Sequence, residues 1–272
     1  MTHDFLTHLS VLQSMETIDL SEMKSIKLMN RIDTKYIAHQ QLLKPLLEMA
    51  SPHYRVQQIK GEFINSYSTI YFDTPTSDMY LLHHNRHLQR QKIRIRTYLN
   101  SHVSFLEIKN KTNKGRTKKI RTEIDKSAFT DFVTSTKERD FLMLHSAYSP
   151  ESLSPHLRTS FDRITLVNSE KTERLTVDLN FRFENFITHQ SAELAHLMII
   201  ELKQDGLRYS EMKQILQELR VVPNKISKYC IGTVLTNSKI KNNRFKRKIR
   251  MIEKIEKEPL ILKSYDSNRT VS

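Results

Sequence analysis

The sequence contains one cysteine, four glycines, seven prolines and no tryptophan in 272 residues. The single cysteine, Cys230, excludes an internal disulfide and gives no sign of an oxidising compartment. The small numbers of glycine and proline argue against a low-complexity chain. No run of about 18 apolar residues is present, and residues 1–12 lack the pattern of a signal peptide. We therefore expect no transmembrane helix and a cytoplasmic protein.

Several common catalytic and binding motifs are also missing. There is no glycine-rich phosphate loop, which excludes P-loop and Rossmann nucleotide sites. The twelve histidines are scattered, and no His/Cys spacing is typical of a zinc site. No Ser-His or Cys-His pair stands out as a nucleophile with its base.

Positive charge is what the sequence has in excess. It carries 44 Lys and Arg against 30 Asp and Glu, which gives a formal net charge of +14. A balance of this kind indicates attraction to nucleic acid, anionic lipid or polyphosphate.

Much of this charge lies on predicted strands. Residues 86–121 include twelve Lys or Arg and a single acid, Glu107. The segment Gln91–Tyr98 alternates basic and apolar residues, and Phe105–Lys109 and Lys119–Arg121 repeat the alternation. Alternate side chains of a strand share a face. The pattern therefore predicts neighbouring strands whose cations form one positive surface.

The alternation on the first of these strands shows the two faces most clearly. Lys92, Arg94 and Arg96 are predicted on one face, and Ile93 and Ile95 on the other. Taken alone, such a pattern is common on the solvated face of an ordinary sheet, and Glu-x-Lys on a strand is most often a surface ion pair. An anion site is favoured because similar groups recur in order along the chain. They are Arg31, Asp33 and Lys35; Lys92, Arg94 and Arg96; Glu107 and Lys109; Lys119 and Arg121; Arg163, Arg174 and Asp178; Glu201 and Lys203; and the segment Asn224–Tyr229.

The residue types of these groups suit phosphate. Arginine binds phosphate oxygens through two N–H groups at once, and lysine supplies a compact positive charge. A carboxylate among them would repel phosphate unless a divalent metal lies between the two. Glu201 and Glu107 are therefore candidate metal ligands.

The fold class follows from the order of the elements. Strands are predicted at about 34–38, 66–73, 88–99, 102–110, 117–125, 157–168, 173–184 and 195–203, with helices between some of them. Many consecutive strands with helical insertions predict a closed antiparallel β-barrel in an α+β chain. Charged residues facing inward would be too costly as structural filling, so they predict a solvated tunnel with a charged ligand.

The C-terminal part differs from the rest. Lys239–Lys257 holds nine Lys or Arg and two acids, a net charge of +7. One interpretation is a solvated or disordered basic extension. A second is an electrostatic tether to anionic lipid, to product or to a membrane-protein partner. A third is a helix that packs the apolar residues Phe245, Ile249, Ile252 and Ile255 against the barrel.

The motifs together resemble the VTC domain, the polyphosphate polymerase branch of the triphosphate tunnel metalloenzymes. The segments that carry the resemblance are Arg31–Tyr36, Tyr71–Thr74, Lys92–Tyr98, Leu106–Lys109, Lys119–Arg121, Phe161–Arg163, Arg174–Asp178, Ile200–Lys203 and Lys225–Tyr229. The resemblance implies three parts: an N-terminal helical segment at 1–29, a tunnel domain at 30–236 and a basic tail at 237–272.

The resemblance further implies an eight-stranded tunnel that binds ATP and transfers its γ-phosphate onto a growing polyphosphate chain. The implied catalytic phosphate ligands are Lys35, Arg94, Arg96, Lys109, Lys119, Arg163, Arg174 and Lys228. The implied substrate-binding residues are Arg31, Lys92, Arg121, Lys203, Lys225 and Ser227. Glu201, with Glu107 as a second candidate, would hold Mn²⁺ or Mg²⁺.

The chain departs from the wider superfamily in its first strand, where two acids usually precede the lysine and here Arg31 and Asp33 stand instead. This disfavours a two-metal triphosphatase. The regulatory domain and membrane helices of the eukaryotic complexes are not found in the sequence, which suggests a bacterial stand-alone version. The alternatives that stay open are a tunnel-fold triphosphatase or cyclase and a non-catalytic binder of polyphosphate or nucleic acid. Specific nucleic-acid binding is not expected, because tryptophan is absent and aromatic residues make up only 8%.

Overall fold

A large antiparallel sheet dominates the structure, a computed structural model that describes residues 10–26, 31–114, 117–125 and 136–257. Its main strands, taken in spatial order, are β2 (Arg31–His39), β11 (Leu197–Asp205), β9 (Glu173–Asn185), β8 (Ser154–Asn168), β4 (Asn65–Asp73), β5 (Arg90–Tyr98), β6 (Val103–Lys111) and β7 (Thr117–Ile124). Short strands β1 (Thr17–Ile18), β3 (Tyr54–Gln57) and β10 (Ser191–Leu194) extend it. The eight main strands correspond to the eight predicted ones.

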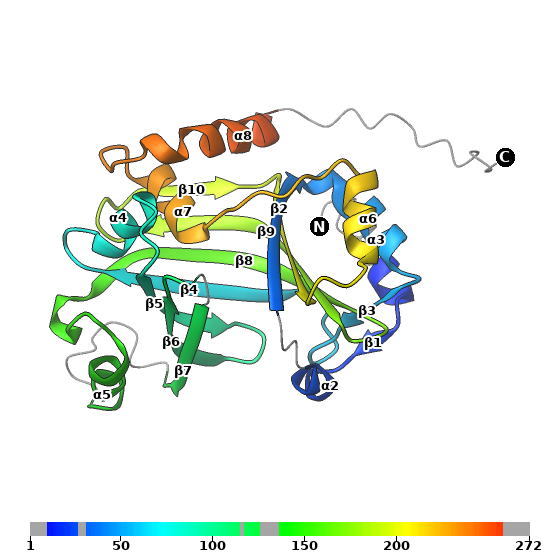
Figure 1. The fold of residues 1–272 in the computed structure, drawn as a ribbon, viewed down its shortest axis with the longest axis horizontal. Helices are drawn as coiled ribbons and strands as arrows, with labels where there is room; N and C mark the ends of the chain where they lie inside the picture. The colour runs from blue at the N-terminus through cyan, green and yellow to red at the C-terminus, as the bar shows by residue number, and fades with distance from the viewer. Residues whose placement is uncertain (1–9, 27–30, 115–116, 126–135, 258–272) are drawn as a thin grey trace.

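Helices lie on both sides of this sheet (Figure 1). They are α2 (Leu20–Ser25), α3 (Leu43–Ala50), α4 (Asp78–His84), α5 (Thr136–His145), α6 (Glu211–Glu218), α7 (Lys228–Thr236) and α8 (Lys246–Lys257), with short 3-10 turns η1 (Gln40–Leu42), η3 (Pro150–Ser152) and η4 (Asn243–Phe245). None of the helices in the described residues is long and apolar enough to cross a membrane.

The prediction of a closed barrel is wrong, because the sheet is open. Strands β2 and β7 end the path and do not pair with each other in the described residues. The free edge of β2 is partly occupied by the segment that leads to α7, since the Asn224 N–H donates to the Lys35 carbonyl at 2.6 Å and Tyr36 forms a bridge with Pro223. Strand β7 exposes charged side chains, including Lys118 and Glu123, a common way to keep an edge strand unpaired.

One face of the sheet packs its apolar side chains against helices. Near β2, β9 and β11 the packing partners come from α3 and α6, with Leu46 and Met212 fully buried. Near β5 and β6 they come from α4 and α5, as Met79 and Leu142 show. Ile93, also fully buried, belongs to this second group. The predicted separation of apolar and cationic side chains on β5 is confirmed.

Helix α7 is held against β8 and β9 by close packing. Its glycine, Gly232, has no room for a side chain, because a Cβ there would lie 2.3 Å from Phe183 Cδ1 and 2.7 Å from Leu157 Cδ2. Buried Asp73, at the end of β4, accepts a 2.5 Å hydrogen bond from the Tyr229 hydroxyl. The position of α7 is thus fixed on both sides.

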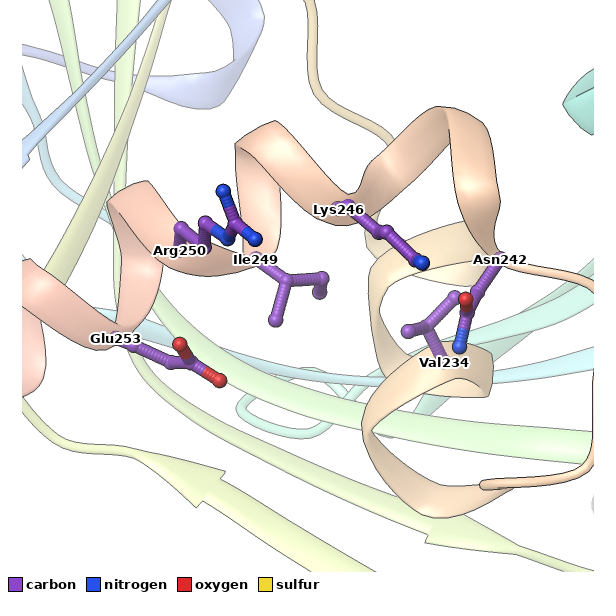
Figure 2. A pocket seen from close by; sticks show the side chains of 6 residues that line it. All are labelled: Val234, Asn242, Lys246, Ile249, Arg250 and Glu253. Carbon is purple, nitrogen blue, oxygen red and sulfur yellow. The ribbon is translucent and has the colours of Figure 1, made fainter.

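Part of the predicted basic tail is a packed helix. Phe245 and Ile252 are buried with α7 and the ends of β9 to β11, and Ile249 and Ile255 pack against the same cluster. Figure 1 shows α8 running alongside β10, with α7 beneath it. A pocket of about 250 Å³ lies between α7 and α8, and Figure 2 shows the side chains that line it, Val234, Asn242, Lys246, Ile249, Arg250 and Glu253. None of these six is a predicted site residue.

The packing of α7 gives a test by substitution. Gly232→Ala should lower the free energy of unfolding by about 1–3 kcal/mol, because the added methyl group forces Phe183, Leu157 or the helix itself to move. Urea unfolding measures this change. Adding Phe183→Leu should relieve part of the clash, so the double variant should lose less stability than the two single losses added together. An unchanged unfolding midpoint for Gly232→Ala would show that α7 is not packed as described.

Candidate functional site

Strand register brings the predicted cations onto one face of the sheet. Residues directly opposite each other in an antiparallel pair have side chains on the same face. Arg94 lies opposite both Tyr71 and Glu107, and Lys109 lies opposite both Lys92 and Lys119. On the other half of the sheet, Glu201 lies opposite Lys35, Lys203 opposite Asp33 and Arg174, and Arg163 opposite Asp178. We call this surface the cation face; its basic residues are Lys35, Lys92, Arg94, Arg96, Lys109, Lys119, Arg163, Arg174, Lys203 and Lys228.

Glu107 holds two of these cations. It is fully buried and accepts hydrogen bonds of 2.8 and 2.6 Å from Arg94 Nε and Nη2, and one of 3.0 Å from Lys119 Nζ. Burial alone would raise the pKa of Glu107, but Arg94, Arg96 and Lys119 outweigh it and lower the pKa well below its usual value. Glu107 is therefore a charged structural partner of the cations.

Asp178 plays the same part on β9. Arg163 donates to it through Nε at 2.5 Å and Nη2 at 2.8 Å, and Lys228 from the first turn of α7 also contacts it. Burial would raise the pKa of this carboxyl, yet Arg163 and Lys228 lower it. Lys228 is thereby tied to the cation face although it belongs to a helix.

Glu201 contacts both Lys35 and Lys203 and is less buried than the other two acids, with 20% of its side chain exposed. Burial, followed by repulsion from Lys203 and Lys228, lowers the pKa of Lys35 to about 7. Burial and the neighbouring Arg163 also lower the pKa of Lys203 well below its usual value. Asp33 and Asp178 thus only partly offset the effects of burial and of repulsion among these cations.

Other cations of the face have no carboxylate partner among the described residues. Arg96 makes only a 3.3 Å hydrogen bond to Thr69 Oγ1, and burial and the cations Arg94 and Arg163 lower its pKa to about 10. The pKa of Lys109 is lowered well below its usual value, first by Arg94 and then by burial. Arg174 has neither a hydrogen bond nor an ion pair through its side chain in the same part of the chain. Such crowding of uncompensated charge is costly unless an anion binds there.

Aromatic rings lie beneath the centre of the face. Arg96 and Arg163 each stand over the rings of Tyr67 and Phe161, at 5.0 to 5.9 Å from the ring centroids. Lys228 Nζ lies 4.5 Å from the centroid of Phe161. These contacts hold the cations at defined positions without neutralising them.

The start of α7 completes the site. Ser227 caps this helix by accepting from the Cys230 N–H at 3.3 Å, and its hydroxyl accepts a 2.9 Å hydrogen bond from Lys92 Nζ. The resemblance implied that Ser227 and Lys228 belong to the phosphate site, and the structure brings them into contact with Lys92 of β5 and Asp178 of β9.

Some predicted residues lie at the margin of the face. Arg31 is exposed and pairs with Asp33 at 2.7 Å, Arg121 is exposed and stacks 4.4 Å from the Phe105 centroid, and Lys225 is exposed before α7.

The structure also adds residues that were not among the predicted site residues. They are Asp178, Thr69, Tyr67, Tyr71 and Phe161. The signal for Asp178 was its place at the end of the Arg174–Asp178 motif, but the identity of its partners depends on strand pairing.

The two predicted metal ligands differ in how well they fit a metal. Glu107 has both oxygens occupied by Arg94 and Lys119 and is closed to solvent, so it does not fit. Glu201 is partly exposed, and Mg²⁺ is often bound by one or two carboxylates together with substrate phosphates. No group of three or more Asp, Glu, His or Cys side chains in the described residues is arranged to hold a metal ion by itself.

The fold and the site together define an antiparallel sheet protein with a strongly basic face. The VTC domain family model matches residues 30–237, most of the chain, so the protein belongs to the VTC domain family. The resemblance found in the sequence is confirmed. No curated protein sequence matches the chain.

Several solved structures are similar to this chain at low sequence identity. A candidate adenylyl cyclase from Hippeastrum, described as having a dominant triphosphatase activity, is 14% identical with a TM-score of 0.50, and the match covers 76% of this chain and 97% of that chain. Candidate adenylate cyclases from Bacillus halodurans and Vibrio parahaemolyticus are 14% and 12% identical, each with a TM-score of 0.44; the matches cover 74% and 75% of this chain and 96% and 97% of theirs. At such identities the Hippeastrum match shows a shared fold and leaves the reaction open.

The ion pairs of Asp178 predict a large effect of its removal. Asp178→Asn should lower the free energy of unfolding by about 3–5 kcal/mol, because Arg163 and Lys228 are left buried without their counter-charge. Since the pKa of Asp178 is lowered on folding, its contribution is present above about pH 4 and is lost as the pH falls through the folded value. The stability difference between wild type and variant, measured by urea unfolding, should therefore begin to shrink below about pH 4.

The matched control is Glu184→Gln, which breaks the exposed ion pair between Glu184 and Arg158. An exposed pair of this kind contributes about 0–1 kcal/mol. Equal stabilities of the Asp178 variant and this control would contradict the structural role of Asp178.

Proposed function

We propose that the protein is a polyphosphate polymerase, which transfers the γ-phosphoryl group of ATP onto a growing polyphosphate chain with the help of a divalent metal. The observation that carries this proposal is the surplus of cations on the cation face. Glu107, Asp178 and Glu201 each contact two cations, while Arg96, Lys109 and Arg174 form no ion pair with an acid in the described residues. A row of phosphates supplies the missing negative charge, and membership of the VTC domain family supports this ligand.

The reaction needs positioning more than covalent chemistry. In phosphoryl transfer the charge spreads over the oxygens of the transferred group, so fixed positive groups lower the barrier. Arg96 and Arg163 lie over aromatic rings, and Lys228 contacts Asp178. In the proposed reaction these three cations bind and orient phosphate oxygens. The acceptor is the terminal phosphate of the chain, already an anion, so no protein base has to remove a proton.

The cysteine and histidine of this region do not supply a nucleophile. Cys230 Sγ lies 3.2 Å from His83 Nδ1, a geometry that resembles a catalytic pair. The thiol, however, is fully buried, and burial raises its pKa. Direct transfer between ATP and the chain, without a covalent enzyme intermediate, is therefore the step we propose.

Glu201 is the residue that would hold the divalent metal, with phosphate oxygens completing the coordination. A metal bound there would offset negative charge on the phosphates. Release of Glu201 from Lys35 and Lys203 would at the same time free two cations for phosphate. The first strand does not offer the two acids of a two-metal triphosphatase, since Asp33 is paired with Arg31.

The proposal is tested by incubating the purified protein with ATP, Mn²⁺ or Mg²⁺ and a short polyphosphate primer. We expect ADP and a lengthened polymer, seen by phosphorus NMR and on a polyphosphate gel. Arg96→Ala should lower kcat/KM by about 10²–10³-fold, because one transition-state contact is lost. Arg94→Ala is less informative, because it also removes the arginine that pairs with the buried Glu107.

Arg182→Ala is the matched control, because Arg182 is 70% exposed and pairs only with Glu193 in the described residues. This variant should keep full activity. Free phosphate as the main product would favour a triphosphatase instead, and the absence of any turnover would favour a non-catalytic binder.

Glu201→Gln tests the assignment of the metal ligand. We expect it to weaken Mn²⁺ binding in the presence of a non-hydrolysable ATP analogue by about tenfold or more, because the carboxylate charge is removed. Binding of the analogue without metal should be kept, since the cations remain. Calorimetric titration measures both. Unchanged Mn²⁺ affinity would mean that Glu201 serves only as an ion-pair partner of Lys35 and Lys203.

A further inference from the structure

A second group of cations continues the cation face beyond Lys92. It consists of Arg90, at the start of β5, Lys111, at the end of β6, Lys225, before α7, and Lys248 on α8. Arg90 lies directly opposite Lys111, an arrangement of like charges that destabilises a sheet. We call these four residues the second cation cluster.

No carboxylate among the described residues pairs with this cluster. Arg90 Nη1 donates to the His87 carbonyl at 2.5 Å, and Lys248 Nζ donates to the Lys225 carbonyl. The side chains of Lys111 and Lys225 make neither a hydrogen bond nor an ion pair within the described part of the chain. The cluster is thus open to an anion from outside.

Three of the four charges, Arg90, Lys111 and Lys248, act on one side chain, His83. The pKa of this imidazole falls to about 2, first because it is buried and then because Lys92, Arg90, Lys248 and Lys111 surround it. Burial also lowers the pKa of Lys111, and repulsion from Arg90, Lys225 and Lys92 lowers it further. Residues from two strands and helix α8, together with the segment before α7, therefore share one electrostatic environment.

The second cation cluster is continuous with the proposed active site. Lys92 is two residues from Arg90 on the same face of β5, and its ammonium donates to Ser227, which in turn is two residues from Lys225. Arg90 and Arg96 are six positions apart on β5, about 20 Å at the rise of an antiparallel strand. A single triphosphate is too short to reach both ends, whereas a longer chain reaches both.

We propose that the second cation cluster is a subsite for the distal phosphates of a polyphosphate chain, so that the protein binds long chains more tightly than short ones. The inference rests on the proposed function, since it assigns the same sheet face a longer ligand. Under this proposal Lys248 of α8, a helix that lies beyond the family match, also binds the polyphosphate chain. The chain would run from Arg96 past Lys92 toward Arg90, Lys111 and Lys248.

The test compares the affinity of the full chain for inorganic triphosphate with that for a polyphosphate of several tens of phosphates. Both are measured by competition against a fluorescent polyphosphate, without ATP or turnover. Wild type should bind the long chain more tightly. The double variant Lys111→Gln/Lys248→Gln should lose about tenfold or more of its affinity for the long chain and bind triphosphate as wild type does.

Lys246→Gln is the matched control, because it removes one lysine from the same helix. Lys246 lines the pocket between α7 and α8 (Figure 2), and residues two apart on a helix do not face the same side. This variant should keep the long-chain affinity. Arg90→Gln gives an independent second variant, because Arg90 belongs to the cluster and lies directly opposite Lys111. It should behave as the double variant does, with thermal melting as the check on folding.

The outcomes separate the two proposals. If wild type binds triphosphate but the double variant loses no long-chain affinity, or loses both affinities equally, the subsite is overturned and the proposed function stands. An equal loss in Lys246→Gln would also overturn it, because the effect would then reflect overall charge alone. If wild type binds neither ligand, the proposed function fails and the subsite fails with it.

Discussion

Like charges held on one face of a sheet repel each other, and the arrangement of this protein follows from how that repulsion is offset. The apolar side chains of β5 and β6 pack against helices, so the intervening cations have to share the opposite face. Glu107 and Asp178, both buried, each hold an arginine and a lysine in fixed positions. Their pKa values are lowered, so they stay charged under ordinary conditions and keep the face intact without a ligand.

The carboxylates do not neutralise the face completely, and we propose that an anion binds to the remaining cations. The pKa values of Lys35 and Lys203 are lowered first by burial and then by neighbouring cations, and that of Lys109 first by Arg94 and then by burial. An anion that binds among them relieves the repulsion, so binding energy is available without rearrangement of the sheet. The excess positive charge on the cation face destabilises the protein without a ligand. We propose that the same charge stabilises the transition state.

Helix α7 couples the fold to the site. Gly232 lets it pack closely on Phe183, and Tyr229 donates to Asp73, which also accepts the N–H groups of Met79 and Tyr80 at the start of α4. With α7 fixed in this way, Ser227 and Lys228 reach the cations of β5 and β9. Phe245 of η4 and Ile252 of α8 pack over α7, and α8 brings Lys248 to the same end of the face.

The sequence by itself determined the eight main strands, the alternation that separates Ile93 from Arg94, and the family, because side-chain periodicity and ordered motifs are local properties of the chain. It could not decide closure of the sheet, since pairing of β2 with β7 depends on edges far apart in sequence, one of them taken up by Pro223 and Asn224. Nor could it decide which acids neutralise which cations. Glu107 was a candidate metal ligand in the sequence, and the structure instead shows it bonded to Arg94, its partner in register, and to Lys119. Only the tertiary structure sets those distances, and charge interactions depend on distance and burial rather than on position in the sequence.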